Sequence, residues 1–306
     1  MAYLPDVLLY FTLALDPIHV GTGGARLGRV DMSIVREPGT NLPKIPATSI
    51  AGACRTYAAL QEPDKFPHCA GQGQAQGNYR GHCGKPDCPI CVTFGFAKRA
   101  GGGFQGLAQF SDARLVLFPV HSLAGPVWVT CSEVLGDLGI VKQEPQDGQV
   151  YVASGVKANG KLNLGWLMLE IARNDFSLDG KLSDVPNEIQ HRTVLVSNKM
   201  FAHIVNDNLE VRTSVSIDPQ TGAAAEHALF TYEALPRACV LYFEVVVSDP
   251  RFYQVEGKTP LDGDIAKVKR TVISGLKLFD SLGIGGMNTR GMGRLRVLNL
   301  GNGGVE

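Results

Sequence analysis

The sequence lacks an excess of either charge, because its 306 residues carry 29 Lys and Arg and 29 Asp and Glu. Proteins that bind nucleic acid are often basic overall, so neutrality counts against that class, although it excludes only a global field. A local basic groove is still compatible, since five basic residues gather around one acid: Arg26, Arg29, Arg36, Lys44 and Arg55. The length suffices for one large domain or two small ones.

The sequence also lacks signals for export or membrane insertion. Residues 1–6 have no basic segment of the kind that begins a signal peptide, and the apolar run Val7–Leu15 is too short to cross a bilayer. No internal repeat or low-complexity tract is present. We therefore expect a cytoplasmic protein with no membrane partner, whose seven cysteines are thiols or metal ligands and not disulfides.

The N-terminal part reads as a strand followed by a helix. Apolar residues alternate along the strand, with Leu9, Phe11, Leu13 and Leu15 on one face, which predicts a half-buried strand. The segment Ile50–Leu60 has the composition of a helix, and two hydroxyl residues precede it as candidate N-caps, Thr48 and Ser49.

The C-terminal part repeats this order. Cys239–Val247 alternates as a strand, and Asp264–Leu282 has the spacing of an amphipathic helix that Gly283 ends. Strand signals return over residues 291–298. Strand, helix and strand at both ends predict an α+β fold with a ferredoxin-like (RRM-like) core, which RNA-binding modules and unrelated proteins both use.

The middle of the chain is harder to assign. Short strands are expected at Leu107–Phe110, Arg114–Pro119, Leu162–Ile171, Val194–Val196 and Val211–Ile217, and a helix at Ser122–Leu138. The last of these strands precedes a turn, Asp218–Gly222, so we expect a hairpin or a long projecting loop near Val205–Leu229.

Residues 62–106 differ from the rest, because they are rich in Gly, Gln, His and Cys and poor in aliphatic residues. Three cysteines follow a C-x4-C-x2-C spacing: Cys83, Cys88 and Cys91. Tetrahedral zinc needs a fourth ligand, for which Cys69 is the first candidate and His68 and His82 are alternatives. Three free thiols in a loop are the simpler interpretation. An insertion with so few core residues needs another source of stability, however, which favours a structural zinc ion.

The stretch between residues 17 and 55 has the composition of an anion site. A strand ends in a glycine loop, an acid follows, and a Pro-Ala-Thr-Ser segment opens the helix that carries Arg55. Glycine lets backbone N–H groups approach a phosphate, and a helix N-terminus adds partial positive charge. The Gly-rich segment Gly283–Arg296 has a similar composition, and both segments suit a polyanion.

Several motifs occur in the same order as in one known family. They are His19–Gly23, Val30–Arg36, Ile45–Arg55, Phe94–Gly95, Gln109–Ala113, Phe118–Val120, Leu229–Pro236 and Gly283–Gly293. Together they resemble the backbone subunit of type III CRISPR–Cas effector complexes, in the repeat-associated mysterious protein (RAMP) superfamily. Arg212–Ile217 makes the type III-B form the most similar, whereas Ala51 replaces a usual Lys and the Cys-rich insertion is closer to types III-A and III-D.

The resemblance implies one RAMP domain over residues 1–306, with a zinc-binding insertion at 62–106 and a second insertion at 140–235 that includes a thumb hairpin. It implies that copies polymerise head to tail, as a helical filament, along a guide RNA and with other effector subunits. It also implies that a thumb residue separates guide from target, for which Phe201 and Ile217 are apolar candidates although such residues are core in most proteins.

The resemblance further implies cleavage of the paired target RNA at Asp31, with Mg²⁺ or Mn²⁺. The simpler interpretation is a solvated Asp31, or one in a salt bridge to Arg29 or Arg36. An Asp in this setting can instead hold a metal-bound water or accept a proton. His19 is the second candidate for the acid or base in catalysis, and a histidine at the end of a strand is equally compatible with a structural role.

The expected RNA-binding residues lie in the two Gly-rich segments and at the helix start. They are His19, Gly21, Gly23, Arg26, Thr48, Ser49, Arg55, Gly285, Gly286, Met287, Asn288, Thr289 and Arg290. Two alternatives remain open. One is a scaffold of the same architecture without activity, and the other is a stand-alone endoribonuclease that processes guide RNA as a monomer with His chemistry.

Overall fold

The computed structural model describes residues 3–23, 30–71, 81–97, 102–178, 180–224 and 229–302. Its largest element is a ten-stranded mixed sheet. The strands are β1 (Asp6–Ala14), β4 (Ala108–Phe110), β5 (Arg114–Val120), β6 (Val127–Cys131), β7 (Gln149–Ala153), β8 (Lys161–Leu164), β9 (Leu167–Phe176), β10 (Thr193–Val196), β13 (Val240–Val247) and β14 (Leu295–Val297). Their order is β14-β1-β13-β5-β6-β10-β7-β9-β8, with β4 also paired to β13.

The remaining elements cover the sheet or project from it. The helices are α1 (Ala47–Leu60), α2 (Pro89–Phe94), α3 (Ser132–Asp137), α4 (Asn187–Gln190), α5 (Asn198–Asp207), α6 (Ile265–Leu276) and α7 (Phe279–Leu282). Two small hairpins pair β2 (Phe96–Ala97) with β3 (Gly103–Phe104), and β11 (Glu210–Ser214) with β12 (Phe230–Ala234). Within the described ranges, no helix is long and apolar enough to span a membrane.

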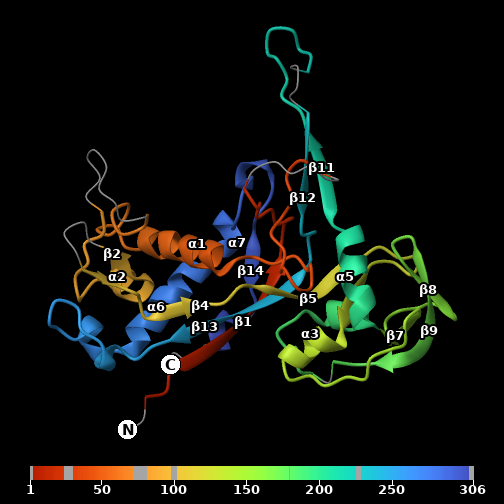
Figure 1. Cartoon of the computed structure of the whole chain (residues 1–306), viewed down its shortest axis with the longest axis horizontal. Helices are drawn as coiled ribbons and strands as arrows, with labels where there is room; N and C mark the ends of the chain where they lie inside the picture. The colour runs from red at the N-terminus through yellow and green to blue at the C-terminus, as the bar shows by residue number, and fades with distance from the viewer. Residues whose placement is uncertain are drawn as a thin grey trace.

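The first lobe contains the strands β1, β13 and β14 and the helices α1 and α6 (Figure 1). The strand β1 pairs antiparallel with β13 on one side and with β14 on the other. Residues at helical spacing on α1, Ile50 and Cys54, join Tyr10 of β1 and Val272 of α6 in the main core cluster. The predicted strands at Leu9–Leu15 and Cys239–Val247 and the predicted helix at Ile50–Leu60 are therefore confirmed, with small shifts of their ends.

The more buried face of β1 is the face opposite its leucines. Tyr10, Thr12 and Ala14 are almost fully buried, whereas Leu9 keeps 37% of its surface exposed. The leucine face is covered near Phe11 and Leu13 by a second core cluster, in which Phe11 packs with Leu117 of β5. Period two identifies the strand, but it does not say which face the helices cover.

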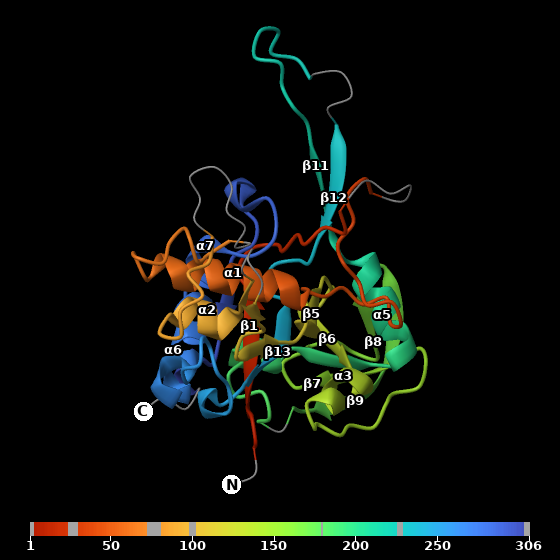
Figure 2. The same cartoon turned by 60° about the vertical axis from the view of Figure 1, so that its left-hand side comes forward.

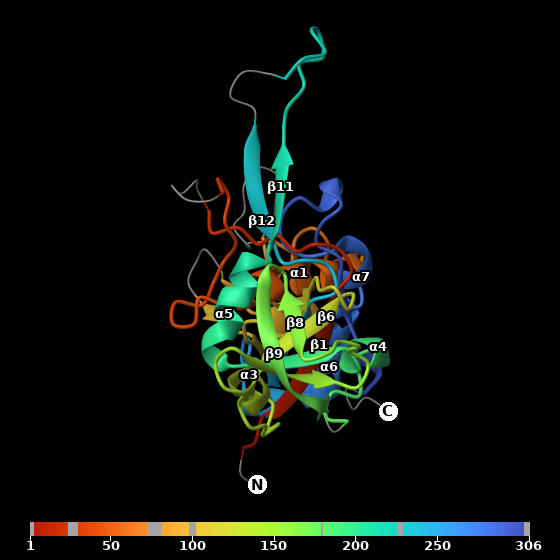
Figure 3. The ribbon, with the colours of Figure 1, turned by 90° about the vertical axis from the view of Figure 1, so that its right-hand side faces the viewer.

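The second lobe is built on β6 to β10 with α3, α4 and α5 (Figures 1 and 3). The helix expected at Ser122–Leu138 is wrong in its first half, which forms β6, and only Ser132–Asp137 is helical. The segment Val-Trp-Val-Thr is β-branched and aromatic, and it pairs with β5 on one side and β10 on the other. Pairing on both sides of β6 outweighs the helical spacing of its apolar residues.

The long C-terminal helix is interrupted. Residues Ile265–Leu276 form α6 and Phe279–Leu282 form α7, and Gly283 ends α7 with a φ of 73° as expected for a glycine C-cap. The expected strand over residues 291–298 is limited to Leu295–Val297.

A long hairpin projects from the junction of the two lobes (Figures 1 and 3). Its strands β11 and β12 pair antiparallel, from Glu210 opposite Ala234 to Ser214 opposite Phe230. The predicted turn is present, because Asp218 N–H donates to the Ala223 carbonyl. Ile217 is 56% exposed near this end of the hairpin, whereas Phe201 lies in α5 and is buried in the core. Of the two apolar candidates, only Ile217 is on the projecting part.

The packing of α1 against α6 depends on Gly275. A Cβ added there would lie 2.2 Å from the Cys54 carbonyl oxygen, so Gly275→Ala must push the two helices apart. We expect the free energy of unfolding to fall by about 1–3 kcal/mol, the usual cost of overpacking. Chemical denaturation measures this change. The control is Gly52→Ala in exposed α1 surface, where a Cβ meets nothing within 4 Å and a gain of roughly 0.5–1 kcal/mol is expected.

Candidate RNA-cleavage site and metal centre

Three segments that are distant in the sequence meet at the base of the hairpin: the N-terminal Gly-rich segment, the C-terminal Gly-rich segment and β12. In Figure 2 the hairpin base lies beside both Gly-rich segments. Ile18 forms a β-bridge with Leu235, and Met32 forms one with Tyr232 of β12. Gly286 N–H donates to the His19 carbonyl at 2.8 Å, so the C-terminal Gly-rich loop closes onto the N-terminal one. The two segments with the composition of an anion site are therefore neighbours in space.

Asp31 lies exposed at this junction and is held by the hairpin. Its Oδ2 accepts hydrogen bonds from the backbone N–H of Thr231 at 2.7 Å and from Thr231 Oγ1 at 2.9 Å. The backbone donor, followed by the hydroxyl, lowers the pKa of the Asp31 carboxyl. Thr231 was not among the predicted site residues, and no sequence signal links residues 200 positions apart.

The expected salt bridge between Asp31 and Arg36 is not formed. Arg36 instead pairs with Glu233 of β12, with 2.9 Å between Nη2 and Oε2, and its Nε donates to Asn206 of α5. Arg29, the other candidate partner, lies outside the described residues. In the part of the chain that the structure describes, Asp31 makes no ion pair.

His19 is buried beneath this surface. Its Nδ1 lies 2.6 Å from the carbonyl oxygen of Glu233, which can only accept, so Nδ1 donates this hydrogen bond. The ring lies edge-on to Tyr232 with centroids 5.9 Å apart. Gly21 fits closely here, because a Cβ would lie 3.1 Å from Nε2. These contacts fix the orientation of the His19 ring.

The loop after α7 presents exposed polar groups beside the hairpin. Gly285 has a φ of 82°, and a Cβ there would lie 2.4 Å from the His19 carbonyl oxygen, so only glycine fits. Gly286 and the short 3-10 helix Asn288–Arg290 are exposed, whereas Met287 is half-buried. The Arg290 guanidinium lies 5.8 Å from the ring centroid of Phe230. The exposed side chain of Arg290 is thus accessible to a ligand, whereas the N–H groups of Gly286 and Arg290 donate to the carbonyls of His19 and Met287.

The start of α1 differs from the prediction. Its N-cap is Pro46, so Thr48 and Ser49 are not caps but lie in the first turn. The carboxylate of Asp112 accepts from Ala47 N–H at 2.7 Å and also pairs with Lys44. A carboxylate therefore already occupies the helix N-terminus.

The other predicted contacts have mixed outcomes. Gly23 is exposed with a φ of 77°, and Arg26 lies outside the described residues. Arg55 faces the cysteine-rich insertion, where its Nε donates to the Cys69 carbonyl at 2.7 Å and its Nη1 donates to the Gly95 carbonyl at 2.8 Å. These contacts give Arg55 a bracing role that the sequence did not suggest.

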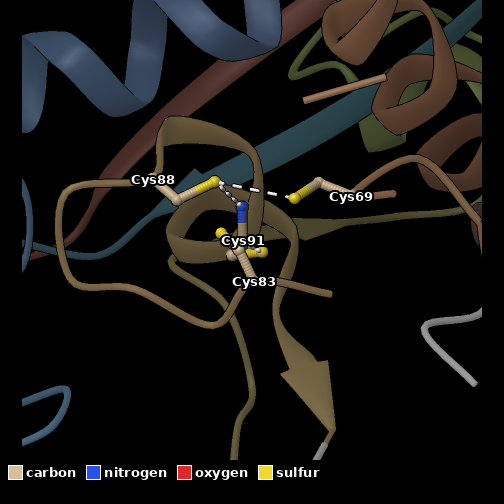
Figure 4. Close-up of side chains that lie close together, drawn as sticks. All are labelled: Cys69, Cys83, Cys88 and Cys91. Carbon is tan, nitrogen blue, oxygen red and sulfur yellow. Dashed lines mark hydrogen bonds between the residues drawn. The ribbon is translucent and has the colours of Figure 1, made fainter. Parts of the chain in front are cut away.

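Four cysteines form a compact cluster (Figure 4), made of Cys69, Cys83, Cys88 and Cys91. All four sulfur atoms lie within 4.8 Å of one another, with 3.7 Å between Cys83 and Cys91. A tetrahedron of zinc–sulfur bonds of about 2.3 Å has sulfur atoms about 3.8 Å apart, so the donor set could hold a metal such as zinc. Cys69 supplies the fourth sulfur, while His82 Nε2 bonds to the Gly71 carbonyl instead.

The remaining cysteines are separate buried thiols, as predicted. Cys54, Cys131 and Cys239 are free and buried in the lobes. Burial raises the pKa of Cys131 to about 11 and also raises the pKa of Cys239. None of the three is suited to act as a thiolate nucleophile.

A model of the RAMP superfamily matches residues 13–296. The chain belongs to the RAMP superfamily. It is 26% identical over 308 residues to the CRISPR system Cmr endoribonuclease Cmr4 of Pyrococcus furiosus, with 92% of each protein covered. The resemblance inferred from the motifs is therefore confirmed, and this relative belongs to the type III-B form that the motifs favoured.

Solved structures share the fold over nearly the whole chain. The type III-B Cmr-beta complex bound to cognate target RNA contains a chain with a TM-score of 0.67 and 14% identity, covering 98% of this chain and 99% of that one. Oligomeric Cmr4 from Pyrococcus furiosus gives a TM-score of 0.60 at 19% identity, covering 95% and 98%. A chain with this fold is thus present in a complex bound to its cognate target RNA.

The two carbonyl contacts of Arg55 predict a stability role. Arg55→Ala should lower the free energy of unfolding by at least ~1.5 kcal/mol, because it removes hydrogen bonds from a charged group. The matched control is Thr56→Ala, the next residue, whose hydroxyl bonds only to the Gly52 carbonyl within the same helix. Equal stability of the two variants in denaturant titrations would contradict the bracing role.

Proposed function

We propose that this RAMP protein is a backbone subunit of a type III-B RNA-guided effector, which binds guide RNA and cleaves the paired target RNA at Asp31. The observation that carries the proposal is an exposed carboxylate fixed at the base of a projecting hairpin, between two Gly-rich loops. Full-length similarity to a Cmr endoribonuclease supports it. Partners are guide RNA, target RNA, further copies of the chain and other effector subunits, in the cytoplasm.

The strand order supports a ferredoxin-like core. Along the chain, the elements of the first lobe follow the order β1, α1, β4 with β5, β13, α6 and β14. In the sheet the strand order is β14-β1-β13-β4, and all neighbouring strands are antiparallel. This is the split βαβ arrangement. On this proposal residues 62–106 are the zinc-binding insertion, and 140–235 are the second insertion with β11 and β12 as its thumb. Exposed Ile217 suits the wedge between guide and target.

RNA binding is proposed along the two loops at the hairpin base. Gly286 and Asn288–Arg290 are exposed there, and Gly21 and Gly23 are exposed on the neighbouring segment. Backbone N–H groups and one guanidinium suit phosphates and 2′-hydroxyls, which carry no sequence information. Specificity then comes from base pairing between guide and target, and the protein reads backbone shape.

Asp31 is suited to the chemistry of RNA cleavage. One carboxylate oxygen, Oδ2, is held by Thr231, and within the described residues Oδ1 has no hydrogen-bond partner. Oδ1 can accept the proton of a 2′-hydroxyl aligned with the scissile phosphate. The nearest acid of β12, Glu233, is engaged by Arg36 and leaves this role to Asp31.

A divalent metal fits this donor set. Magnesium is commonly held by one or two carboxylates together with phosphate oxygens of the substrate, so a single open carboxylate oxygen is sufficient protein ligation. In this alternative role Oδ1 of Asp31 would hold Mg²⁺ or Mn²⁺ in place of accepting the proton, and the metal would neutralise charge developing on the phosphate.

The cysteine cluster is proposed to bind about one zinc per chain as a closed structural site. Cys88→Ser should lose zinc and lower the thermal midpoint, because the insertion has few other core residues. Cys131→Ala, a buried thiol in the second lobe, should keep its zinc. Metal analysis of the purified proteins measures the zinc content of both variants, and thermal unfolding measures the midpoint. Wild-type protein without zinc would exclude the site.

Asp31→Asn tests the catalytic assignment. The substitution keeps the shape but removes the charge that accepts a proton or holds a metal, so target cleavage by the reconstituted complex should fall by at least ~10²-fold. Assembly and guide binding should persist. The control is Asp175→Asn on exposed β9, which should cleave at the wild-type rate.

The outcomes separate the alternatives. Cleavage by Asp31→Asn at the wild-type rate would reject the catalytic role, and His19 would be tested next. A wild-type complex that cuts nothing with magnesium or manganese would favour the scaffold. A monomer that cuts repeat RNA alone would favour the guide-processing endoribonuclease.

A further inference from the structure

The carboxylate of Asp31 is held in place by a residue of the hairpin and not by its own loop. The Thr231 hydroxyl has two contacts with Asp31, because it accepts from Asp31 N–H at 3.1 Å and donates to Oδ2 at 2.9 Å. A serine could make the same two contacts, whereas a valine of the same shape could make neither. The chemistry therefore requires a hydroxyl at this position.

The contact is part of a longer attachment. Met32 N–H donates to the Thr231 carbonyl at 3.1 Å, and Glu233 N–H donates to the Met32 carbonyl at 3.0 Å. Asp31 and Met32 thus run beside β12 as a short parallel strand. Because β12 is one strand of the projecting hairpin, any displacement of the hairpin base also displaces the carboxylate.

We infer that Thr231 is a positioning residue for the cleavage reaction, which fixes Oδ2 of Asp31 so that Oδ1 is presented to the RNA backbone. This inference rests on the proposed function. It adds a residue to the site and makes the hairpin a support of the catalytic carboxylate as well as a separator of strands.

The electrostatic surroundings leave Thr231 as the group that adjusts Asp31. The charged or titratable groups on the elements packed here are His19, Tyr232, Arg36 with Glu233, Arg212 with Glu210, and Arg290. None of them makes an ion pair with Asp31 within the described ranges. The hydrogen bonds from Thr231 lower the pKa of Asp31, so removal of the hydroxyl should raise it and reduce the ionised fraction at acidic pH.

The test compares Thr231→Val with Thr231→Ser in the reconstituted complex, with guide and matched target RNA. We expect Thr231→Val to cleave about 10-fold more slowly at neutral pH, the scale of one hydrogen bond to a charged group, and its acidic limb to move to higher pH. Thr231→Ser should restore both. Thr213→Val is the control, because Thr213 lies opposite Thr231 in the hairpin register and should change neither rate nor pH profile.

A second measurement does not depend on cleavage. Carbon-13 NMR of Asp-labelled protein, with Asp31→Asn for assignment, follows the pKa of Asp31 directly. An upward shift in Thr231→Val, and in Thr231→Ala as a second variant, supports the positioning role. An unchanged pKa and pH profile overturns it, as does a slower reaction without any pKa shift, which marks a merely structural effect.

The two proposals can fail separately. A shifted pKa in Thr231→Val together with wild-type cleavage by Asp31→Asn upholds the hydroxyl hydrogen bond as a contributor to the lowered Asp31 pKa, beside the backbone N–H of Thr231, but removes Asp31 from catalysis. Loss of activity in Asp31→Asn with wild-type behaviour of Thr231→Val in both measurements keeps the proposed function and overturns the positioning role.

Discussion

The buried residue Glu233 connects the parts of the site. Only 8% of the surface of Glu233 is exposed. Its carboxylate accepts a hydrogen bond from Arg36, its backbone carbonyl accepts one from His19 Nδ1, and its N–H donates one to the Met32 carbonyl. Arg36 extends the connection to Asn206 of α5 in the second lobe. A buried ion pair with one partner removed leaves an uncompensated charge, so loss of either partner is costly. The hairpin, the Asp31 segment and the second lobe share this one support.

A chain without net charge is compatible with the proposed anion-binding role, because many of its charged side chains form ion pairs with one another. Arg294 pairs with Asp16 and Arg296 pairs with Asp280, close to the C-terminal Gly-rich loop. Such exposed pairs add little stability, but they reduce the local positive field. The proposed RNA-binding surface is therefore compatible with a neutral chain, because it does not require a dense array of cations.

Periodicity was sufficient for the elements that pack one face on a core, such as β13 and α6. It was insufficient for Val127–Cys131, where pairing with two neighbouring strands decides the conformation. Local motifs were sufficient to select Asp31 and the four clustered cysteines as candidates, since those signals lie within short stretches. Thr231 and the pairing of Arg36 with Glu233 could not be predicted, because the contacts join residues that only the completed fold brings together. Arg55 shows the converse, since a basic residue in an expected anion site donates to backbone carbonyls.

The position of β1 between β13 and β14 has a consequence for biosynthesis. During translation β1 is made long before either of its partners, because β13 and β14 follow it at a great distance in the sequence. Contacts so distant in sequence form slowly and leave the early strand unpaired while the ribosome continues. The same order applies to Asp31, whose support at Thr231 is also made late. A prematurely terminated chain that ends before β12 therefore carries the acid without its support, and Asp31 and Thr231 come together only after β12 has been made.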